Sequence, residues 1–198
     1  MLSDGYHDVP PGKLASVVTH LEMTSPAPLR PAPKVEGAEI RRVTRPDLDW
    51  YRDLFTRVGT EEWLWFSRLE MDDAALAAIL NHPGVHCYAM HTDGRDEGLL
   101  ELDFRHPQDC ELAFFGTTRA MIGTGAGRML MNHAIHAAWS EQIERFHVHT
   151  CTLDHPSALA FYQRSGFVPV RQQIEIADDP RVSGLIPRDA GPHVPVFE

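Results

Sequence analysis

Three glycines at alternate positions are the clearest candidate for chemistry in this sequence. They lie in the segment 123–127, Gly-Thr-Gly-Ala-Gly, between a strand-like run and an amphipathic helical run. A turn of this kind exposes successive backbone N–H groups at the positive end of a helix, and such an arrangement binds phosphate. A tight strand-to-helix connection without a ligand explains the glycines as well, and the glycines alone do not decide between the two.

Two common nucleotide-binding patterns do not fit this turn. No Gly-Lys-Ser/Thr follows it, which excludes a Walker loop. The spacing is GxGxG instead of GxGxxG, and the turn comes late in the chain, after predicted antiparallel strands. A Rossmann dinucleotide site is therefore disfavoured.

Four histidines could form a zinc site. His147 and His149 share one face of a predicted strand, and His133 and His136 lie three residues apart on the preceding helix. The helix pair falls on the predicted polar face, and no carboxylate completes a known metal pattern. We therefore predict solvated or hydrogen-bonded histidines and no metal.

The elements that position these residues follow from the hydrophobic periodicity. Strand-like runs cover 38–43, 85–91, 98–105, 110–116, 146–151 and 167–176, and helical runs cover 45–58, 72–81, 128–142 and 156–165. Gly59 is predicted to end the first helix, and Thr92-Asp93-Gly94 predicts a hairpin. The expected fold is α/β, with a single central mixed, mostly antiparallel sheet flanked by helices.

Proline content divides the chain into three parts. Residues 1–37 contain six prolines and are predicted to be an N-terminal arm, 38–176 the folded domain, and 177–198 an extended, mostly irregular tail. Within the arm, 14–23 is apolar and β-branched enough for a short strand or an ordered arm. The sequence leaves open whether the arm is a surface linker or covers a cleft or a partner.

Composition excludes several classes of protein. Twenty-eight acidic residues against eighteen basic ones give a net charge of −10, which argues against nucleic acid and against anionic membranes as partners. The longest apolar run, 74–80, is too short to span a bilayer, and residues 1–4 do not resemble a signal peptide. Three cysteines without a CxxC pair exclude a disulfide framework. We expect a cytoplasmic protein.

Two segments together resemble the GNAT superfamily of N-acetyltransferases. The phosphate-binding turn of this family reads Gln/Arg-x-x-Gly-x-Gly/Ala. Gly125 and Gly127 match its two small positions, and Gly123 matches a glycine that is commonly added. Ile122 stands where the family usually has Arg or Gln. The segment 155–167 is similar to the closing motif of the family, with matches at Ala158, Tyr162, Arg164, Gly166 and Phe167 and with His155 in place of asparagine.

The resemblance implies acetyl-CoA as co-substrate. The turn amides would hold its pyrophosphate, and its pantetheine would lie along the strand 110–117. The implied cofactor contacts are Phe115, Gly116, Thr117, Gly123, Thr124, Gly125, Ala126, Gly127, Arg128, Ala158 and Arg164. The resemblance also places Tyr162 where the family's tyrosine protonates the departing CoA thiolate.

The general base is open between carboxylates on two predicted strands. Glu111 lies on the strand before the glycine turn, and Glu101 shares a face of the preceding strand with Asp103. A carboxylate is costly to bury on a central strand without a reason, which favours a site. A solvated edge, or an ion pair with Arg105 or Arg119, explains them too, and a water chain could replace either base.

The resulting hypothesis is an N-acetyltransferase that moves acetyl to a primary amine of a small molecule or peptide by direct attack in a ternary complex. A run of aromatic residues, 63–66, is either core or the wall of an acceptor pocket, and Glu61 and Glu62 could hold a cationic amine. The alternative is a non-catalytic acyl-CoA-binding module that docks a partner through its proline-rich arms. The oligomeric state, a homodimer included, is left open.

Overall fold

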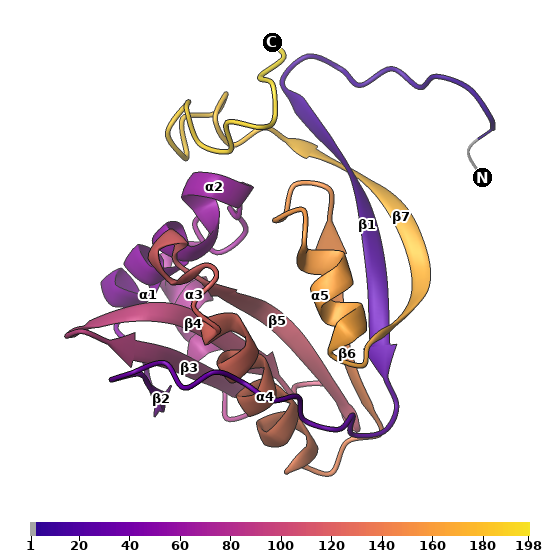
Figure 1. Cartoon of the computed structure of the whole chain (residues 1–198). Helices are drawn as coiled ribbons and strands as arrows, with labels where there is room; N and C mark the ends of the chain where they lie inside the picture. Colours follow the sequence, from indigo (N-terminus) through magenta and orange to yellow (C-terminus); the bar gives the residue numbers. More distant parts are fainter. Residues whose placement is uncertain (1–2) are drawn as a thin grey trace.

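Seven strands form one sheet in the computed structural model, which describes residues 3–198 (Figure 1). Their order is β2-β3-β4-β5-β6-β1-β7. Neighbouring strands are antiparallel except β5 and β6, which run parallel. The expected mixed, mostly antiparallel sheet flanked by helices is confirmed.

The elements follow the predicted runs within a few residues. The strands are β1 (Lys13–Met23), β2 (Glu39–Val43), β3 (Val85–Thr92), β4 (Arg95–Asp103), β5 (Asp109–Thr117), β6 (Arg145–Cys151) and β7 (Val168–Asp178). The α-helices are α1 (Leu48–Phe55), α2 (Glu61–Trp63), α3 (Asp73–Leu80), α4 (Ala126–Trp139) and α5 (Ala158–Arg164). A π-helical turn, Thr56–Thr60, joins α1 to α2, and a 3-10 turn, Arg119–Met121, precedes α4.

Local side-chain chemistry explains several of these boundaries. Asp47 and Asp72 cap α1 and α3, because each carboxylate accepts a hydrogen bond from a backbone amide three residues further on. The β3–β4 hairpin turns at Asp93 and Gly94, which both have positive φ, as a two-residue type I′ turn requires. Gly166 has φ +106° and ends α5. The predicted hairpin is confirmed.

Gly59 does not end the first helix, and that prediction was wrong. It lies buried inside the π-helical turn, with the chain still helical on both sides. A Cβ atom at this position would come within 2.0 Å of the Trp65 indole. Glycine is needed here because the Trp65 ring packs directly on the backbone.

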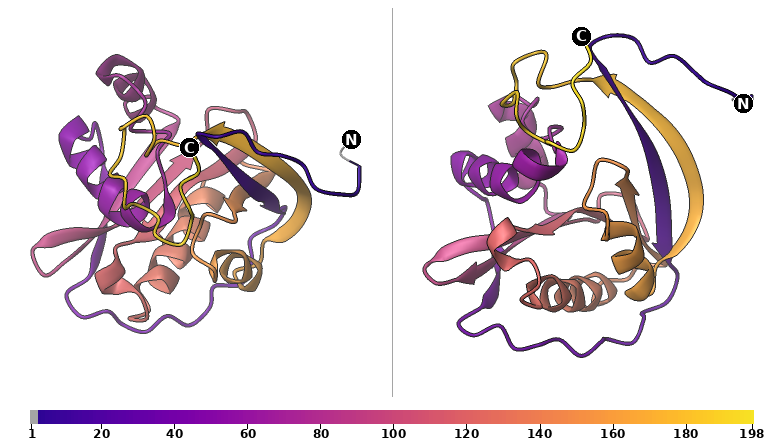
Figure 2. Two further views of the ribbon diagram at one scale, coloured as in Figure 1. Left: turned by 90° about the horizontal axis from the view of Figure 1, so that it is seen from above. Right: turned by 45° about the horizontal axis from the view of Figure 1, so that its top comes forward.

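Two hydrophobic clusters fill the two faces of the sheet. One cluster joins α1 and α3 to β3 and β4 and includes Tyr51, Phe55 and Leu99. The other lies under α4 and includes Leu100 and Leu130, so neighbouring residues of β4 point to opposite faces. Figure 2 shows the helices on both sides of the sheet.

The N-terminal segment provides the sixth strand of the sheet. β1 pairs with β6 on one side and with β7 on the other, through partners such as Val18 with Cys151 and Val17 with Ile174. The prediction of a strand between the proline clusters is confirmed, but its place inside the sheet was not foreseen, because its pairing partners lie more than 120 residues away in sequence. The division of the chain at residue 38 stays a prediction.

The C-terminal tail is irregular, as predicted, but it is folded instead of extended. Arg181 is almost fully buried and pairs with Asp179, and its guanidinium also donates to the carbonyl oxygens of Ala190 and Val194. Burial alone would raise the pKa of Asp179, yet the hydrogen bonds and charge of Arg181 lower it overall. The tail thereby buries Ile186 against the region of Leu14 and Leu64.

No helix in the described part of the chain is long and apolar enough to cross a membrane.

Candidate active site

The separation of β5 from β6 opens a cleft in the sheet. The two strands pair only from Asp109 with Arg145 to Glu111 with His147. Just beyond, the register of β4 with β5 shifts, and Ala113 is the extra residue in β5. A bulge of this kind bends a strand away from its neighbour. The cleft has a volume of about 880 Å³ and runs from the glycine turn to the aromatic residues that follow α2.

The glycine turn leaves three amides free at one end of this cleft. Gly123 and Gly125 have φ values of +82° and +94°, and Gly125 precedes the first turn of α4. Within residues 3–198, the amides of Gly123, Gly125 and Gly127 donate no hydrogen bond. A Cβ atom at Gly127 would meet no atom within 4 Å, so this amide borders open space. Free amides at a helix N-terminus form a binding surface for an anion.

Gly125 has a second, structural reason to be glycine. A Cβ atom there would lie 2.8 Å from Cγ of Pro33, in the linker between β1 and β2. Together with the positive φ, this contact means that a side chain at Gly125 would strain the protein itself. Gly127 has neither constraint and tests ligand binding more directly.

Three arginines without carboxylate partners lie near one another, and one of them, Arg164, lines the cleft. Among the described residues, no carboxylate lies within 4.0 Å of Arg30, Arg128 or Arg164. Arg128 donates to the Ser165 hydroxyl and lies over the Phe161 ring. Burial, followed by repulsion from Arg30 and Arg164, lowers the pKa of Arg128. In a chain of net charge −10, uncompensated positive charge beside free amides points to an anionic ligand.

The C-terminal half of β5 forms one wall of the cleft. Phe115, Gly116 and Thr117 all line it, as does Ala158 at the start of α5. Phe114 packs in the α1 cluster and Phe115 against the α4 cluster, as expected for neighbours on opposite faces.

Tyr162 lines the cleft from α5 with its ring held by other aromatic rings. Phe115, Phe161 and Phe167 pack around it at centroid distances of 5.9–6.2 Å. In the described part of the chain, its hydroxyl makes no hydrogen bond. Burial, and secondarily the charge of Asp154, raises the pKa of this phenol. The hydroxyl therefore keeps its proton near neutral pH and can donate it to a ligand.

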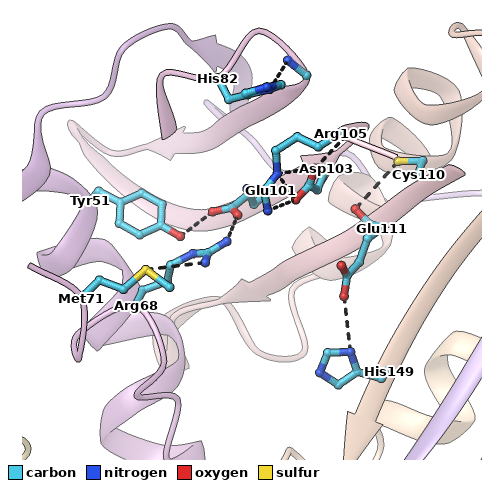
Figure 3. Close-up of polar contacts among 11 residues, drawn as sticks. Tyr51, Arg68, Met71, His82, Glu101, Asp103, Arg105, Cys110, Glu111 and His149 are labelled. Atoms are coloured by element: carbon cyan, nitrogen blue, oxygen red, sulfur yellow. Dashed lines mark hydrogen bonds and ion pairs between the residues drawn. The ribbon is translucent and has the colours of Figure 1, made fainter. Parts of the chain in front are cut away.

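Glu111 and His149 form an ion pair inside the cleft (Figure 3). An oxygen of Glu111 lies 3.5 Å from Nδ1 of His149, and both side chains remain partly open to solvent. The hydrogen bond to His149 is the main cause that lowers the pKa of Glu111, and the same bond raises the pKa of His149. Both residues were singled out from the sequence, but their pairing was not predicted, because they lie on different strands.

Glu101 lies elsewhere, in a buried group with Tyr51 and Arg68 (Figure 3). Its side chain is 0% exposed and does not line the cleft. It accepts a hydrogen bond of 2.5 Å from the Tyr51 hydroxyl and another from Arg68. Its oxygens are thus engaged by protein groups, which argues against a role as general base. Asp103 pairs with Arg105, one of the ion pairs that the sequence allowed.

Asp154 closes the opposite side of the cleft and was not singled out by the sequence. It accepts hydrogen bonds from the Thr150 hydroxyl and from the indole N–H of Trp65, which follows α2. His155 replaces the expected asparagine, and its Nδ1 accepts from the amide of Ser157 at the start of α5. Both contacts fix the loop between β6 and α5.

Aromatic residues that follow α2 line another part of the cleft. Residues 63–68 line it, whereas Glu61 and Glu62 do not. Glu62 pairs with Arg119 at the surface, so neither acid is placed to hold an amine in the cleft.

His133 on α4 and Cys151 on β6 are both partly buried. His133 does not face solvent, since its ring packs 4.8 Å from that of Tyr88. Burial, and then the charge of His136, lowers the pKa of His133. Cys151 lines the cleft, where burial and then Asp154 raise the pKa of its thiol to about 11.

The splayed strands, the glycine turn and α5 correspond to the fold of an acyltransferase family. Residues 48–167 match the family described as Acetyltransferase (GNAT) family. The chain belongs to this family. A comparison with curated protein sequences found no match.

Solved structures share the fold at low sequence identity. A putative GNAT acetyltransferase from Novosphingobium aromaticivorans has a TM-score of 0.57 and 18% identity, over 86% of this chain and 68% of that one. An aminoglycoside acetyltransferase from an uncultured soil metagenomic sample has a TM-score of 0.51 and 16% identity, over 66% and 88% of the two chains. A functionally unknown conserved protein from Staphylococcus epidermidis has a TM-score of 0.56 and 12% identity over 85% of this chain, which spans only 63% of that structure.

Proposed function

We propose that the protein transfers an acetyl group from acetyl-CoA to a primary amine of a small molecule or peptide. One observation carries this proposal: a single cleft has free amides and arginines at one end and a carboxylate–imidazole pair and a protonated phenol along its walls. Membership of the GNAT family supports it. Location in the cytoplasm stays a prediction.

Acetyl-CoA would bind through backbone and arginine contacts. The amides of Gly123, Gly125 and Gly127 are free to receive its pyrophosphate, and Arg128 and Arg164 add positive charge. Thr124 and Ala126 complete this turn. The pantetheine would follow β5 along Phe115, Gly116 and Thr117, where β5 no longer pairs with β6.

The amine must lose a proton to attack, and the Glu111–His149 pair is placed to take it. Glu111 stabilises the protonated imidazole of His149, so the pair accepts a proton only after His149 has released its own. The pair therefore titrates as one unit with a raised apparent pKa. Catalysis should rise with pH through that value.

The thiolate that leaves after the attack needs a proton, and Tyr162 is placed to give one. Its raised pKa keeps the phenol protonated, and the absence of an internal partner within residues 3–198 leaves its hydroxyl available. The thiol of Cys151 is protonated near neutral pH for the same reason, burial. A protonated thiol is a poor nucleophile, which favours direct attack by the amine over an acetylated cysteine.

The acceptor would enter at the aromatic end of the cleft. Trp63 and Phe66 offer apolar surface there, and Arg68, Arg105 and Glu111 also line the cleft. The structural neighbour with aminoglycoside acetyltransferase activity suggests amine-bearing small molecules as the first acceptors to test.

The test is release of free thiol from acetyl-CoA in the presence of a panel of amines, with binding of CoA measured in parallel. Thiol release that depends on one amine supports the proposal. CoA binding without release by any amine would favour a non-catalytic acyl-CoA-binding module. Dephosphorylated pantetheine serves as the control, because it lacks the groups that the glycine turn would hold, and it should stabilise the protein much less than CoA. Equal stabilisation by both would contradict the role of the turn.

A further inference from the structure

The two edges of the sheet differ in how they meet solvent. β2 is five residues long and carries Glu39, Arg41 and Arg42, which is how proteins usually protect an edge strand. β7 is eleven residues long, and nearly all its side chains are exposed. Ile174 and Ile176 are 51% and 50% exposed, and no described segment pairs with the outer side of β7. Figure 1 shows β7 as the outermost strand next to β1.

Two of the usual protections of an edge strand, a proline and a β-bulge, are confined to one end of β7. Pro169 and a register shift in the pairing with β1 fall before residue 171. From Arg171 to Asp178 the strand pairs regularly with β1, so its outer N–H and C=O groups form a continuous row. A long, regular edge strand that no other segment covers is a template for pairing with another strand.

The charges of β7 select a second β7 as that strand. In an antiparallel pair centred on Gln173, Arg171 lies opposite Glu175 of the partner subunit, and Glu175 lies opposite the partner's Arg171. The register with β1 puts Arg171, Gln173 and Glu175 on the same face of the sheet, so both ion pairs form on one side. Opposite charges directly across strands stabilise a pair, and like charges destabilise it. A pair centred on Glu175 would set two glutamates against each other.

We propose that two copies of this chain form a symmetric dimer through antiparallel pairing of their β7 strands, centred on Gln173. The pairing extends the sheet across the two-fold axis and covers the exposed Ile174 of each copy. β7 lies outside the residues that match the GNAT family, and the proposal does not depend on acetyl transfer. It also reaches the cleft, because Glu175 lines it and would acquire the partner's Arg171 as a neighbour.

Reversing the charges on β7 tests the proposed register between the two β7 strands. Sedimentation equilibrium of the parent should give twice the chain mass of 22.3 kDa at micromolar concentration. Arg171→Glu or Glu175→Arg alone replaces two favourable pairs by two repulsive ones and should weaken association at least tenfold. The double variant Arg171→Glu with Glu175→Arg restores both pairs and should restore the dimer. The control Arg42→Glu changes the same charge on β2 and should leave the dimer intact.

A cysteine cross-link gives a second readout that does not depend on electrostatics. Gln173→Cys places a thiol opposite its own copy, at about 5 Å between Cβ atoms, and should form a covalent dimer under oxidation. Arg171→Cys is the matched control, because the two copies would lie about 13 Å apart along the strands and should not link. A monomeric parent, a dimer that survives both single charge reversals, or equal cross-linking at both positions would overturn the proposal.

Discussion

Two groups of polar residues, one built on β4 and the other on β5 and β6, each contain a tyrosine and a glutamate, yet they differ in what those side chains can do. Tyr51, Arg68 and Glu101 are buried, and both carboxylate oxygens of Glu101 accept hydrogen bonds within this group. Tyr162 and Glu111, with His149, line the cleft and keep hydrogen-bonding capacity for a ligand. Side-chain type alone does not indicate a catalytic group; an unsatisfied position facing a cleft does.

The two groups differ in how neighbouring charges and hydrogen bonds offset the burial of their side chains. Burial and then Glu101 raise the pKa of Tyr51, while for Arg68 the loss of hydration is outweighed by the attraction of Glu101. Tyr51 and Arg68 therefore both keep their protons near neutral pH. The Glu111–His149 pair lies in a partly open site, and its imidazole pKa is raised, mainly by the hydrogen bond to Glu111. The first group should contribute to stability and the second to activity.

The largest expected effect is on stability, from Arg68→Met. This change leaves the fully buried Glu101 carboxylate without its cation, and removal of one partner of a buried pair costs about 3–5 kcal/mol. Urea unfolding followed by circular dichroism measures the loss. Adding Glu101→Leu to the same chain should recover most of it; a double variant as unstable as the single one would show that the pair is not the source.

Glu111→Gln should affect activity instead. We expect turnover to fall by about 10²–10³ at neutral pH, with the free energy of unfolding changed by less than about 1 kcal/mol. Because Glu111 is the main cause that raises the pKa of His149, and burial lowers it, the acidic limb of the rate profile should also move to lower pH. A pH–rate profile of kcat/KM measures both. An unchanged profile would remove the pair from the mechanism.

The two tyrosines provide a matched comparison. Tyr162→Phe removes a hydroxyl with no internal partner in the described chain and should lower turnover by about 10² at saturating acetyl-CoA, with acetyl-CoA affinity little changed. Tyr51→Phe removes a hydrogen bond to a buried carboxylate and should cost about 1.5–3 kcal/mol of stability without changing turnover. If Tyr51→Phe lowered turnover and Tyr162→Phe lowered only stability, the roles that we assign to the two groups would be reversed.

The smallest effect concerns the glycine turn. Gly127→Val projects a side chain into open space where the pyrophosphate would lie, and it should weaken CoA binding by more than tenfold with the fold intact. Isothermal titration with CoA measures this. Gly125→Val is a poorer probe, because Pro33 and the positive φ at Gly125 would also destabilise the protein. Undiminished CoA affinity in Gly127→Val would assign the turn to architecture alone.

The sequence predicted what short-range patterns can encode. The hairpin at Asp93-Gly94, the glycine turn and the place of Tyr162 on a short helix all rest on residues close in sequence. It could not separate Glu101 from Glu111, because their surroundings are formed by Arg68 and His149 from distant segments. Asp154 gave no signal either, since its role depends on an indole 89 residues away.

The pairing of β1 with strands far away in sequence also limits the order in which the sheet can form. β1 leaves the ribosome first, but its two neighbours in the sheet are β6 and β7, near the end of the chain. At ordinary rates of synthesis, on the order of ten seconds separate its appearance from that of β7. Until β6 has been synthesised, the apolar residues Val18 and Leu21 have no strand to pair with. The pairing of β1 is therefore completed late in folding. A chain that stops before residue 168 lacks β7, so one side of its β1 strand stays unpaired.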